Sequence, residues 1–325
     1  MTIEPVRLSE LARGRDLKLS GPDAEIVTFG ALNTHSPSVD RMLTWIVDSG
    51  LIGELDRTGI GACVAHESVA AELGERPLLV TSGDPAEQFY SLYIELARSG
   101  TWKALESRRG ENVQIATSAV VHEGVQLGDD CVIMDQVVVL PNTRIGDRVT
   151  VKPAAVIGGD GFQVITIDGT PTMVPHRGGV WIGDDVQIGS QTCVDRGMFG
   201  GLTVIEDGTR IDNLVHIGHS AQLGPGGIVA ACTELGAITA GEGFWLGPNC
   251  AVLQEAHLGH HSYVGIGSVV IGDIAPHALA YGVPARPHAW VCSCRTKLEF
   301  SGRRASCRRC GREFALEDGS ISELA

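Results

Sequence analysis

Two groups of residues in this chain have the types and the spacing for chemistry: a set of histidines and a set of four cysteines. The histidines gather in the second half of the 325 residues, at His216, His219, His257, His260 and His261. His219 stands in the segment RIDNLVHIGHSAQLG. A neutral imidazole near physiological pH can accept a proton from an amine or hydroxyl that attacks an acyl carbonyl. Spacing alone fits a surface histidine equally well.

Acyl transfer also needs a donor for the negative charge that develops on the carbonyl oxygen. The backbone N–H of a glycine is suited to this task because nothing shields it. Gly236 follows His219 at about the length of one coil of the repeat described below. The two residues are therefore expected on adjacent coils, on either side of one cleft.

The four cysteines form two close pairs near the C-terminus. Cys292 and Cys294 (CSC) precede Cys307 and Cys310 (CRRC), with twelve residues between the pairs. Four thiolates across a hairpin-sized gap suit a tetrahedral structural zinc, and Gly311 gives the second pair a flexible backbone. A metal-free thiol hairpin is the alternative. The remaining cysteines are scattered and are predicted to be small core residues: Cys63, Cys131, Cys193, Cys232 and Cys250.

The same segment carries a local excess of positive charge. Between residues 292 and 312 a single acid, Glu299, faces Arg295, Lys297, Arg303, Arg304, Arg308, Arg309 and Arg312, although the whole chain has a net charge of −14. A solvated basic hairpin would simply keep the tail soluble. The functional alternative is a dock for an anion, either the phosphates of CoA or the acidic surface of a carrier protein.

The element that must position these residues is a repeat of six. From Ile115 to Ile157 an aliphatic residue falls at every sixth position, and the pattern returns from Ile182, from Ile205 and from Leu246. This period is typical of a parallel β-helix, in which three flat faces make one coil of about 18 residues. Each coil buries its aliphatic residues only against its neighbours. The segment Val229–Ala240 is one residue short, so one coil must be irregular.

The chain divides into three parts. Residues 1–108 are expected to form a small α/β domain, with strands near residues 25–29, 43–47, 61–65 and 77–80 and a helix capped by Asp84, with Pro85 and Glu87 in its first turn. Residues 109–288 form the β-helix, which ends near two prolines, and residues 289–325 form the ribbon. Two segments, 158–179 and 196–203, interrupt the repeat. Because long insertions often carry function, Asp160 and Phe162 are expected to shape a donor or acceptor pocket.

Composition excludes several classes of partner. A net charge of −14 argues against nucleic acid, whose phosphates need a basic face. No apolar run is long enough to span a membrane, and the N-terminal residues lack the apolar core of a signal peptide. Nine cysteines without an export signal indicate thiols in a reducing compartment, so the protein is expected in the cytoplasm. The triangular cross-section of a β-helix favours a homotrimer with one cleft at each interface.

Three segments resemble a known family. IGGDGFQ (157–163), WIGDDVQIGSQTCVDRG (181–197) and IEDGTRIDNLVHIGHSAQLG (205–224) are similar to the corresponding segments of the UDP-3-O-acylglucosamine N-acyltransferases of lipid A synthesis, a family of hexapeptide-repeat acyltransferases. The resemblance covers roughly 285 residues. It implies a homotrimeric left-handed β-helix with a small N-terminal nucleotide-binding domain. It also implies that His219 is the base, that Gly236 is the oxyanion glycine, and that Asp212 and Asn213 orient the acceptor or the base.

The chain also departs from that family. The family's second functional histidine corresponds to Glu255, with His257 nearby. Its uracil-stacking pair corresponds to Trp45 and Leu51, and an asparagine between them to Asp48. Losing one aromatic ring and adding a negative charge near a diphosphate predicts a weaker UDP site.

The C-terminus departs as well. The helices with which the family holds acyl carrier protein are absent. In their place GVPARPHAWVC and the ribbon resemble the tail of sugar N-acetyltransferases that use acetyl-CoA, which makes Arg286 a candidate contact for CoA.

The sequence therefore predicts a mainly β N-acyltransferase. It would move an acyl group from acyl-CoA or acyl carrier protein to the amine of a nucleotide-linked amino sugar or a related amine. Two alternatives stay open: a carbonic-anhydrase-like enzyme with histidine-bound zinc between subunits, and a non-catalytic ligand-binding trimer. About one zinc per chain fits the ribbon alone, and about two would support the carbonic-anhydrase-like site. Acyl length and the nucleotide are not determined by the sequence.

Overall fold

A computed structural model describes residues 1–34, 36–317 and 319–324. The chain forms two compact units. The first contains Met1–Ala104 together with two segments that interrupt the repeat, Asp160–Gly179 and Gly197–Leu202. The second contains the β-helix and the C-terminal residues. No helix in the described ranges is long and apolar enough to cross a membrane.

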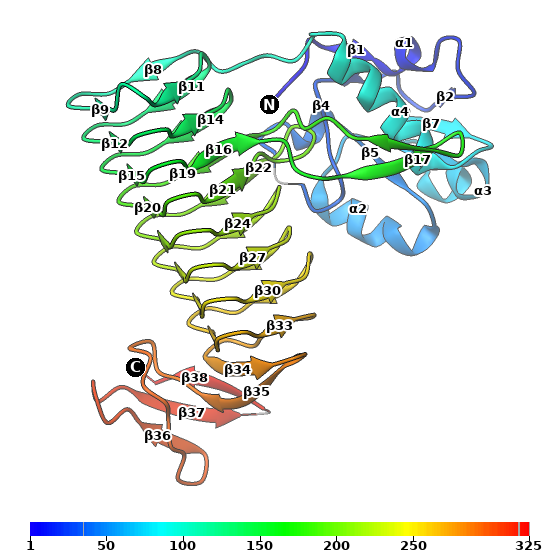
Figure 1. Ribbon diagram of the computed structural model, residues 1–325. Coiled ribbons are helices and arrows are strands. Elements are labelled where there is room, and N and C mark those ends of the chain that lie inside the picture. Colours follow the sequence, from blue (N-terminus) through cyan, green and yellow to red (C-terminus); the bar gives the residue numbers. More distant parts are fainter. Residues whose placement is uncertain (35, 318, 325) are drawn as a thin grey trace. The chain divides into compact units, whose positions relative to one another are not determined.

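The first unit is built on a five-stranded sheet (Figure 1). Its strands, in sheet order, are β2 (Lys18–Ser20), β7 (Leu78–Thr81), β6 (Ala62–His66), β5 (Met42–Ile46) and β4 (Thr28–Phe29). The last four run parallel, and β2 pairs antiparallel with β7. A separate pair joins β1 (Val6–Arg7) to β3 (Glu25–Ile26). The helical elements are α1 (Leu8–Ala12), η1 (Val39–Arg41), η2 (Ser49–Leu51), α2 (Ile52–Thr58), α3 (Glu67–Ala70), η3 (Ala71–Leu73) and α4 (Pro85–Arg98). The predicted strands are confirmed.

Helix α4 begins as the sequence predicts. The Asp84 side chain accepts a hydrogen bond from the N–H of Ala86 at 2.8 Å, and Pro85 occupies the first turn. Phe89 and Tyr93 on its inner face are fully buried. Glu87 does not complete a capping box, however, because its carboxylate accepts the backbone N–H of Asp168 from the inserted segment.

The first insertion belongs to the core of this unit. It folds as an antiparallel hairpin of β17 (Val164–Ile167) and β18 (Thr170–Met173). The Tyr93 hydroxyl donates to the carbonyl of Pro175 at 2.6 Å, and Arg177 donates to the carbonyl of Ala97 at 2.9 Å. Phe199 from the second insertion is buried against the Phe89 ring of helix α4. The sequence-based division at residue 108 assigned both insertions to the β-helix. The six-residue repeat does not show which distant segment an insertion contacts.

The second unit is a left-handed parallel β-helix with three sheets of stacked short strands (Figure 1). The first sheet contains β8 (Arg108–Arg109), β11 (Val125–Leu127), β14 (Thr143–Ile145), β19 (Gly179–Ile182), β22 (Leu202–Ile205), β25 (Gln222–Leu223), β28 (Thr239–Ala240) and β31 (His257–Leu258). The second contains β9 (Gln114–Ile115), β12 (Val132–Ile133), β15 (Thr150–Val151), β20 (Gln187–Ile188), β23 (Arg210–Ile211), β26 (Ile228–Val229), β29 (Trp245–Leu246), β32 (Tyr263–Val264), β34 (Ala278–Gly282) and β35 (Ala285–Trp290). The third contains β10 (Val120–Val121), β13 (Val138–Val139), β16 (Val156–Gly159), β21 (Cys193–Asp195), β24 (His216–Ile217), β27 (Glu234–Leu235), β30 (Ala251–Val252) and β33 (Val269–Val270).

The aliphatic residues of the six-residue repeat point inward, as predicted. From Leu127 onward they are all buried in one continuous core, and Ile115 and Val121 pack against its open end. Each fully buried aliphatic side chain contributes roughly 1.5–3 kcal/mol relative to an exposed one. A second set of small inward residues lies two positions before the first, as in Cys131, Val137 and Ala155. Cys193 and Cys232 are exposed, which corrects their predicted core position.

Most corners of the coils use a residue in the left-handed backbone conformation. Asn112, Asp130 and Arg148 repeat at 18-residue intervals with φ of 54°, 57° and 55°. At another corner Ser220 and Glu255 have φ of 64° and 66°, but no described residue of the coil between them has a positive φ at that corner. The short coil is therefore short because it lacks this turn residue.

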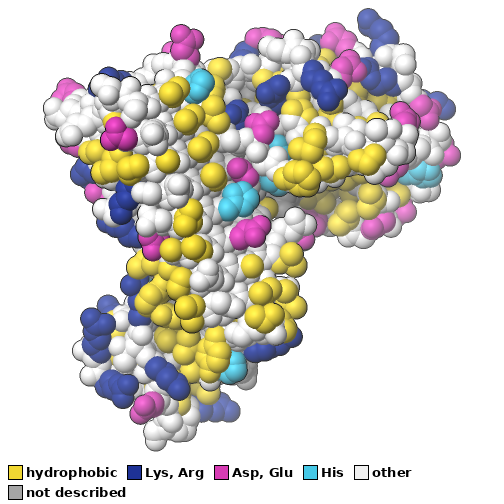
Figure 2. Space-filling view, viewed as in Figure 1, with side chains coloured by type: hydrophobic (Ala, Val, Ile, Leu, Met, Phe, Trp, Pro, Cys, Tyr) yellow, Lys and Arg dark blue, Asp and Glu magenta, His cyan; other side chains and the backbone are white. Residues whose placement is uncertain are grey.

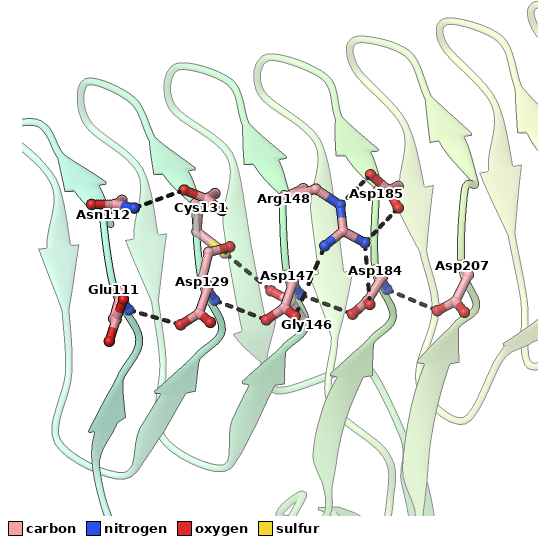
Figure 3. Close-up of polar contacts among 11 residues, drawn as sticks. Glu111, Asn112, Asp129, Cys131, Gly146, Asp147, Arg148, Asp184, Asp185 and Asp207 are labelled. Carbon is pink, nitrogen blue, oxygen red and sulfur yellow. Dashed lines mark hydrogen bonds and ion pairs between the residues drawn. The ribbon is translucent and has the colours of Figure 1, made fainter.

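Aspartates tie successive coils together at one corner (Figure 3). The carboxylate of Asp129 accepts the N–H of Glu111 at 2.8 Å, Asp147 accepts that of Asp129 at 2.8 Å, and Asp184 accepts that of Asp147 at 2.9 Å. Arg148 donates to both oxygens of Asp185 at 2.8 Å. This guanidinium lowers the pKa of the Asp185 carboxyl. The acidic character of this edge thus serves coil stacking.

The last coil closes with a hairpin. Strand β34 continues the parallel ladder, and β35 returns antiparallel to it after a cis peptide bond at Val283–Pro284. Pro287 lies within β35 at a register irregularity, where no regular ladder bond is required of it. The cysteine ribbon then adds three antiparallel strands, β36 (Arg304–Ser306), β37 (Glu313–Glu317) and β38 (Ser320–Glu323). The predicted ribbon is thus a small antiparallel sheet.

Candidate active site

His219 lies at the corner that follows β24. Ile217 points into the core, Gly218 follows it, and the His219 side chain is half-buried at the outer surface. Loss of water on burial lowers the pKa of His219 below its usual 6.5, and the carboxylate of Asp195 opposes this effect in part. The imidazole is therefore mostly neutral at physiological pH, which is the form that a general base requires.

The next coil places Gly236 beside Gly218, because Ile217 pairs with Leu235 in the parallel ladder. The N–H of Gly236 donates to the carbonyl of Val252 at 3.0 Å. This ladder bond occupies the N–H, so Gly236 does not offer the oxyanion donor expected from the sequence. The following N–H, that of Ala237, donates to no acceptor in the described part of the chain. By the same register Ala237 lies next to His219.

Gly218 and Gly236 have a steric role. A Cβ on Gly218 would come within 2.8 Å of the Leu235 carbonyl oxygen, and one on Gly236 within 2.7 Å of the Gln254 nitrogen. Neither backbone atom can move aside without shifting a whole coil. Glycine at these positions therefore allows close stacking of the coils beside His219.

Asp212 and Asn213 lie at the corner before β24, whereas His219 lies at the corner after it. The Asn213 side chain accepts the N–H of Ser190 at 2.8 Å, and Asp212 accepts the N–H of Asn213 at 2.8 Å. These bonds stabilise a turn and its neighbouring coil. The structure thus explains the motif by coil stacking and does not bring its side chains to His219.

Glu255 and His257, the two candidates for the position of the family's second histidine, lie in different parts of the β-helix. Glu255 occupies the left-handed position of the same corner as Ser220, two coils further on, and is exposed. His257 lies on β31 in a different sheet, with its N–H donating to Asp273 at 2.9 Å. Glu255 therefore shares the His219 corner, and His257 does not.

The expected acceptor residues lie in the first unit. Trp45 is half-buried among aromatic rings, 4.5 Å from Phe89 and 5.3 Å from Tyr90 between ring centroids. The Asp48 side chain accepts the N–H of Gly50 at 2.8 Å and begins η2. Packing of Trp45 against other rings limits the ring face that remains for a base.

The first insertion contributes two further candidates to that unit. The Asp160 carboxylate accepts the N–H of His176 at 3.5 Å. The Phe162 side chain is 82% exposed, so it has surface to offer to a ligand.

The four cysteines converge as a metal site requires. The Sγ atoms of Cys292 and Cys310 are 3.4 Å apart, and those of Cys294 and Cys307 are 3.5 Å apart. All four sulfur atoms lie within 4.8 Å of one another. A zinc ion with sulfur ligands at about 2.3 Å in a tetrahedron would hold them about 3.8 Å apart, so the set fits zinc. Among the described residues no other group of three or more His, Cys, Asp or Glu converges in this way.

The basic residues of the ribbon lie on its surface (Figure 2). Arg308 pairs with Glu299 at 3.6 Å, and Arg312 pairs with Glu323 at 3.0 Å. Arg303 and Arg304 are exposed and form no ion pair with any described residue. The Arg295 guanidinium instead lies over the Trp245 ring, 5.1 Å from its centroid, and anchors the ribbon to the β-helix.

Arg286, the candidate contact for CoA, lies apart from these residues in strand β35. Its side chain is exposed and donates to the carbonyl of Ala285 at 3.1 Å.

Sequence reasoning missed an ion pair beside His219. The Nε2 atom of His216 lies 3.0 Å from an Asp195 carboxylate oxygen, whose side chain is only 13% exposed. The two residues come from neighbouring coils, since β21 pairs with β24. The sequence around Asp195 (VDRG, residues 194–197) indicates this pair only when the register of the two coils is known.

Comparison with known proteins defines the class. Residues 124–159 match the model of the bacterial transferase hexapeptide (six repeats). A solved structure, the UDP-N-acetylglucosamine acyltransferase from Campylobacter jejuni, is similar with a TM-score of 0.51 and 26% identity, over 57% of this chain and 70% of that one. Together with the parallel β-helix, these findings place the chain in the class of hexapeptide-repeat β-helix proteins.

The family follows from closer relatives. UDP-3-O-acylglucosamine N-acyltransferase 2 of Legionella pneumophila (strain Paris) is 31% identical over 262 residues, which is 70% of this chain and 74% of that protein. The UDP-3-O-acylglucosamine N-acyltransferase of Wolinella succinogenes is 38% identical over 161 residues, 49% of this chain and 50% of that protein. The chain belongs to the UDP-3-O-acylglucosamine N-acyltransferase family.

Proposed function

We propose that this enzyme transfers an acyl group from a thioester to an amine, with His219 as the base. The observation that carries the proposal is a half-buried imidazole beside an N–H without an acceptor, that of Ala237 on the next coil. His219 takes a proton from the attacking amine. The Ala237 N–H donates to the carbonyl oxygen as it becomes negative, and the thiolate leaves.

The acceptor is proposed to be a nucleotide-linked amino sugar. Relatives named for UDP-3-O-acylglucosamine support this class of acceptor. In the first unit Trp45, Asp48, Asp160 and Phe162 are the candidates to bind it. Asp48 adds a negative charge that disfavours any diphosphate close by. Leu51 takes the place of one ring of the family's uracil-stacking pair, so the base need not be uracil.

Around the base, Asp212, Asn213 and Glu255 remain candidates to contact the acceptor. The Asn213 side chain accepts the Ser190 N–H of the preceding coil, and Asp212 accepts the Asn213 N–H. Glu255 is therefore the stronger of the three, because its side chain is exposed at the His219 corner. Single substitutions at these positions would raise the KM for the acceptor where the contact is real.

A homotrimer is proposed as the working assembly. Three sheets of eight, eight and ten strands give the β-helix a triangular section that can pack around a three-fold axis. Isolated coils are filled by their own aliphatic residues, so a substrate cleft has to form between subunits.

The donor is proposed to bind partly through the basic ribbon. Arg303 and Arg304 are exposed without acidic partners among the described residues, in a chain whose net charge is −14. Either the phosphates of CoA or the acidic surface of an acyl carrier protein would meet that charge. Arg286 on β35 is the candidate contact nearest in sequence to the ribbon.

A structural zinc is proposed for Cys292, Cys294, Cys307 and Cys310. The geometry of their sulfur atoms supports it, and the Arg312 guanidinium donates to the Cys310 sulfur at 3.5 Å, where it would stabilise a thiolate. All nine cysteines are free, which supports a reducing compartment such as the cytoplasm.

Intact-mass detection of the product tests the whole proposal. Acetyl-CoA, longer acyl-CoA and acyl carrier thioesters would be offered with a panel of UDP-, dTDP- and GDP-linked amino sugars. Acylated amine in any combination supports the reaction class and identifies donor and acceptor together. No product across the panel would contradict the proposed acceptor class.

A further inference from the structure

His216 and His219 are consecutive outward side chains of one coil. The residues between them are Ile217, which points into the core, and Gly218, which has no side chain. His216 lies in a row of outward residues that runs across the coils, with Cys193 before it and Glu234 after it. Its side chain is 47% exposed, so it can reach a ligand at this surface.

The two histidines have opposite surroundings. His216 Nε2 lies 3.0 Å from the mostly buried Asp195 carboxylate, which favours the imidazolium. Glu234 adds a second negative charge on the other side, whereas Cys193 is a thiol with a raised pKa and adds none. His219 loses water by burial, which favours the neutral ring. Paired groups whose environments separate their pKa values in this way are typical of acid and base roles.

We propose that His216 is the general acid of the transfer reaction, and that Asp195 is its positioning residue. The inference rests on the proposed thioester-to-amine transfer. As the amine nitrogen forms its bond to the carbonyl carbon, its proton passes to His219. When the carbon–sulfur bond breaks, the sulfur takes the proton from Nδ1 of His216, because Nε2 is held by Asp195. Exchange with water then returns His216 to its charged form and His219 to its neutral form.

The opposite pKa shifts of His216 and His219 make the catalytically competent protonation state the most populated one. The pKa of His216 is raised by the Asp195 hydrogen bond, and the pKa of His219 is lowered by burial. Between the two values most molecules hold His219 neutral and His216 charged. The pH profile should therefore show an acidic limb from His219 and an alkaline limb from His216.

The test exploits the leaving group. The same acyl group would be supplied on CoA, an alkyl thiol, and on 4-nitrothiophenol, whose thiolate needs no proton to leave. With the CoA thioester, His216→Gln should lower kcat by about 100-fold, the lower end of general-acid effects, and with the aryl thioester by less than about threefold. Asp195→Asn should move the alkaline limb to lower pH. His122→Gln, an exposed histidine on a distant coil, is the matched control and should change neither.

The possible results distinguish the role of His216 from the proposed function. An equal loss on both donors, or an unmoved alkaline limb in Asp195→Asn, would overturn the role of His216 while leaving the proposed function intact. Absence of transfer by the unaltered enzyme would overturn both. NMR titration of the histidine ring protons gives a readout independent of turnover: His216 should titrate above His219, and the reverse order would overturn the proposal.

Discussion

Ala237 lies next to His219 on the following coil, and its backbone N–H donates to no acceptor in the described part of the chain. The relationship arises from a short coil of the β-helix. Its register with the preceding coil is 18 residues at Ile217 and Leu235 but 17 at Leu223 and Ala240. The residue that is missing would have formed the left-handed turn directly after Ala237. An unpaired N–H beside a half-buried imidazole is the arrangement that acyl transfer requires.

Replacement of His219 by alanine should lower kcat by roughly two to four orders of magnitude, because that is the usual contribution of a general base. The proposed trimer and its melting temperature should be preserved, since the side chain is outside the core. Steady-state kinetics and light scattering would check both. Near-normal turnover of His219→Ala would contradict the assignment.

The acidic limb of the pH profile reports the same group. Burial lowers the pKa of His219 below 6.5, so the neutral base persists to lower pH than for an exposed histidine. Activity should therefore be lost only as the pH falls through a value below 6.5. A limb centred above that value would mean that another group is titrating.

The oxyanion donor can be assigned by exchanging single backbone N–H groups for ester oxygens. Lactic acid in place of Ala237 should lower kcat by about 10²–10³-fold, the cost of losing one such donor. Glycolic acid in place of Gly236 removes the bond to Val252, which should cost stability, about 0.5–1.5 kcal/mol, and little turnover. Comparing kcat with the free energy of unfolding for the two proteins separates these roles. The opposite pattern would restore the oxyanion role to Gly236.

The basic ribbon should govern donor binding. Arg303→Gln with Arg304→Gln should raise the KM of the donor by about two- to thirtyfold, since an exposed ion pair contributes roughly 0.2–1 kcal/mol. The dependence of that KM on salt should also flatten. Arg13→Gln with Arg98→Gln, exposed residues of the first unit, is the charge-matched control. Identical donor kinetics in both double variants would contradict the dock.

The ribbon should contain about one zinc per chain, measured by elemental analysis of the purified protein. Cys307→Ser should remove the metal and make the segment around residues 292–312 sensitive to protease, because the small ribbon core then loses its crosslink. Cys232→Ser, an exposed thiol outside the ribbon, is the control and should retain zinc. Zinc that persists in Cys307→Ser would instead support histidine ligands between subunits.

The sequence predicted the fold well where the fold is periodic. The six-residue spacing identified the inward residues, and all of them from Leu127 onward are buried. Short-range signals were also sufficient for helix α4, because Asp84 caps a helix whose buried face repeats locally. Such features depend on neighbours within one turn or one coil, so they can be predicted from the local sequence.

The candidate site depends on local and distant features alike. Residue type and spacing alone single out His219 and the cysteine set, whose sulfur atoms converge in the structure. Gly236 was expected as the oxyanion donor because counting residues cannot tell which N–H the ladder already uses. The motif of Asp212 and Asn213 does not reveal that the Asn213 side chain accepts an N–H of the preceding coil and that Asp212 accepts the N–H of Asn213.

The amino-acid sequence by itself determined a β-helix, a histidine at one of its corners and a set of four closely spaced thiols. Only the tertiary structure decided which atoms remain available. Coil register, the pairing of strands on successive coils, brings His216 to Asp195 and leaves the Ala237 N–H without an acceptor in the described part of the chain. It likewise took three-dimensional packing to place residues 160–179 in the core of the first unit. The physical reason is common to these cases: hydrogen bonds and burial between distant segments depend on where the backbone passes, and composition and local periodicity do not encode that path.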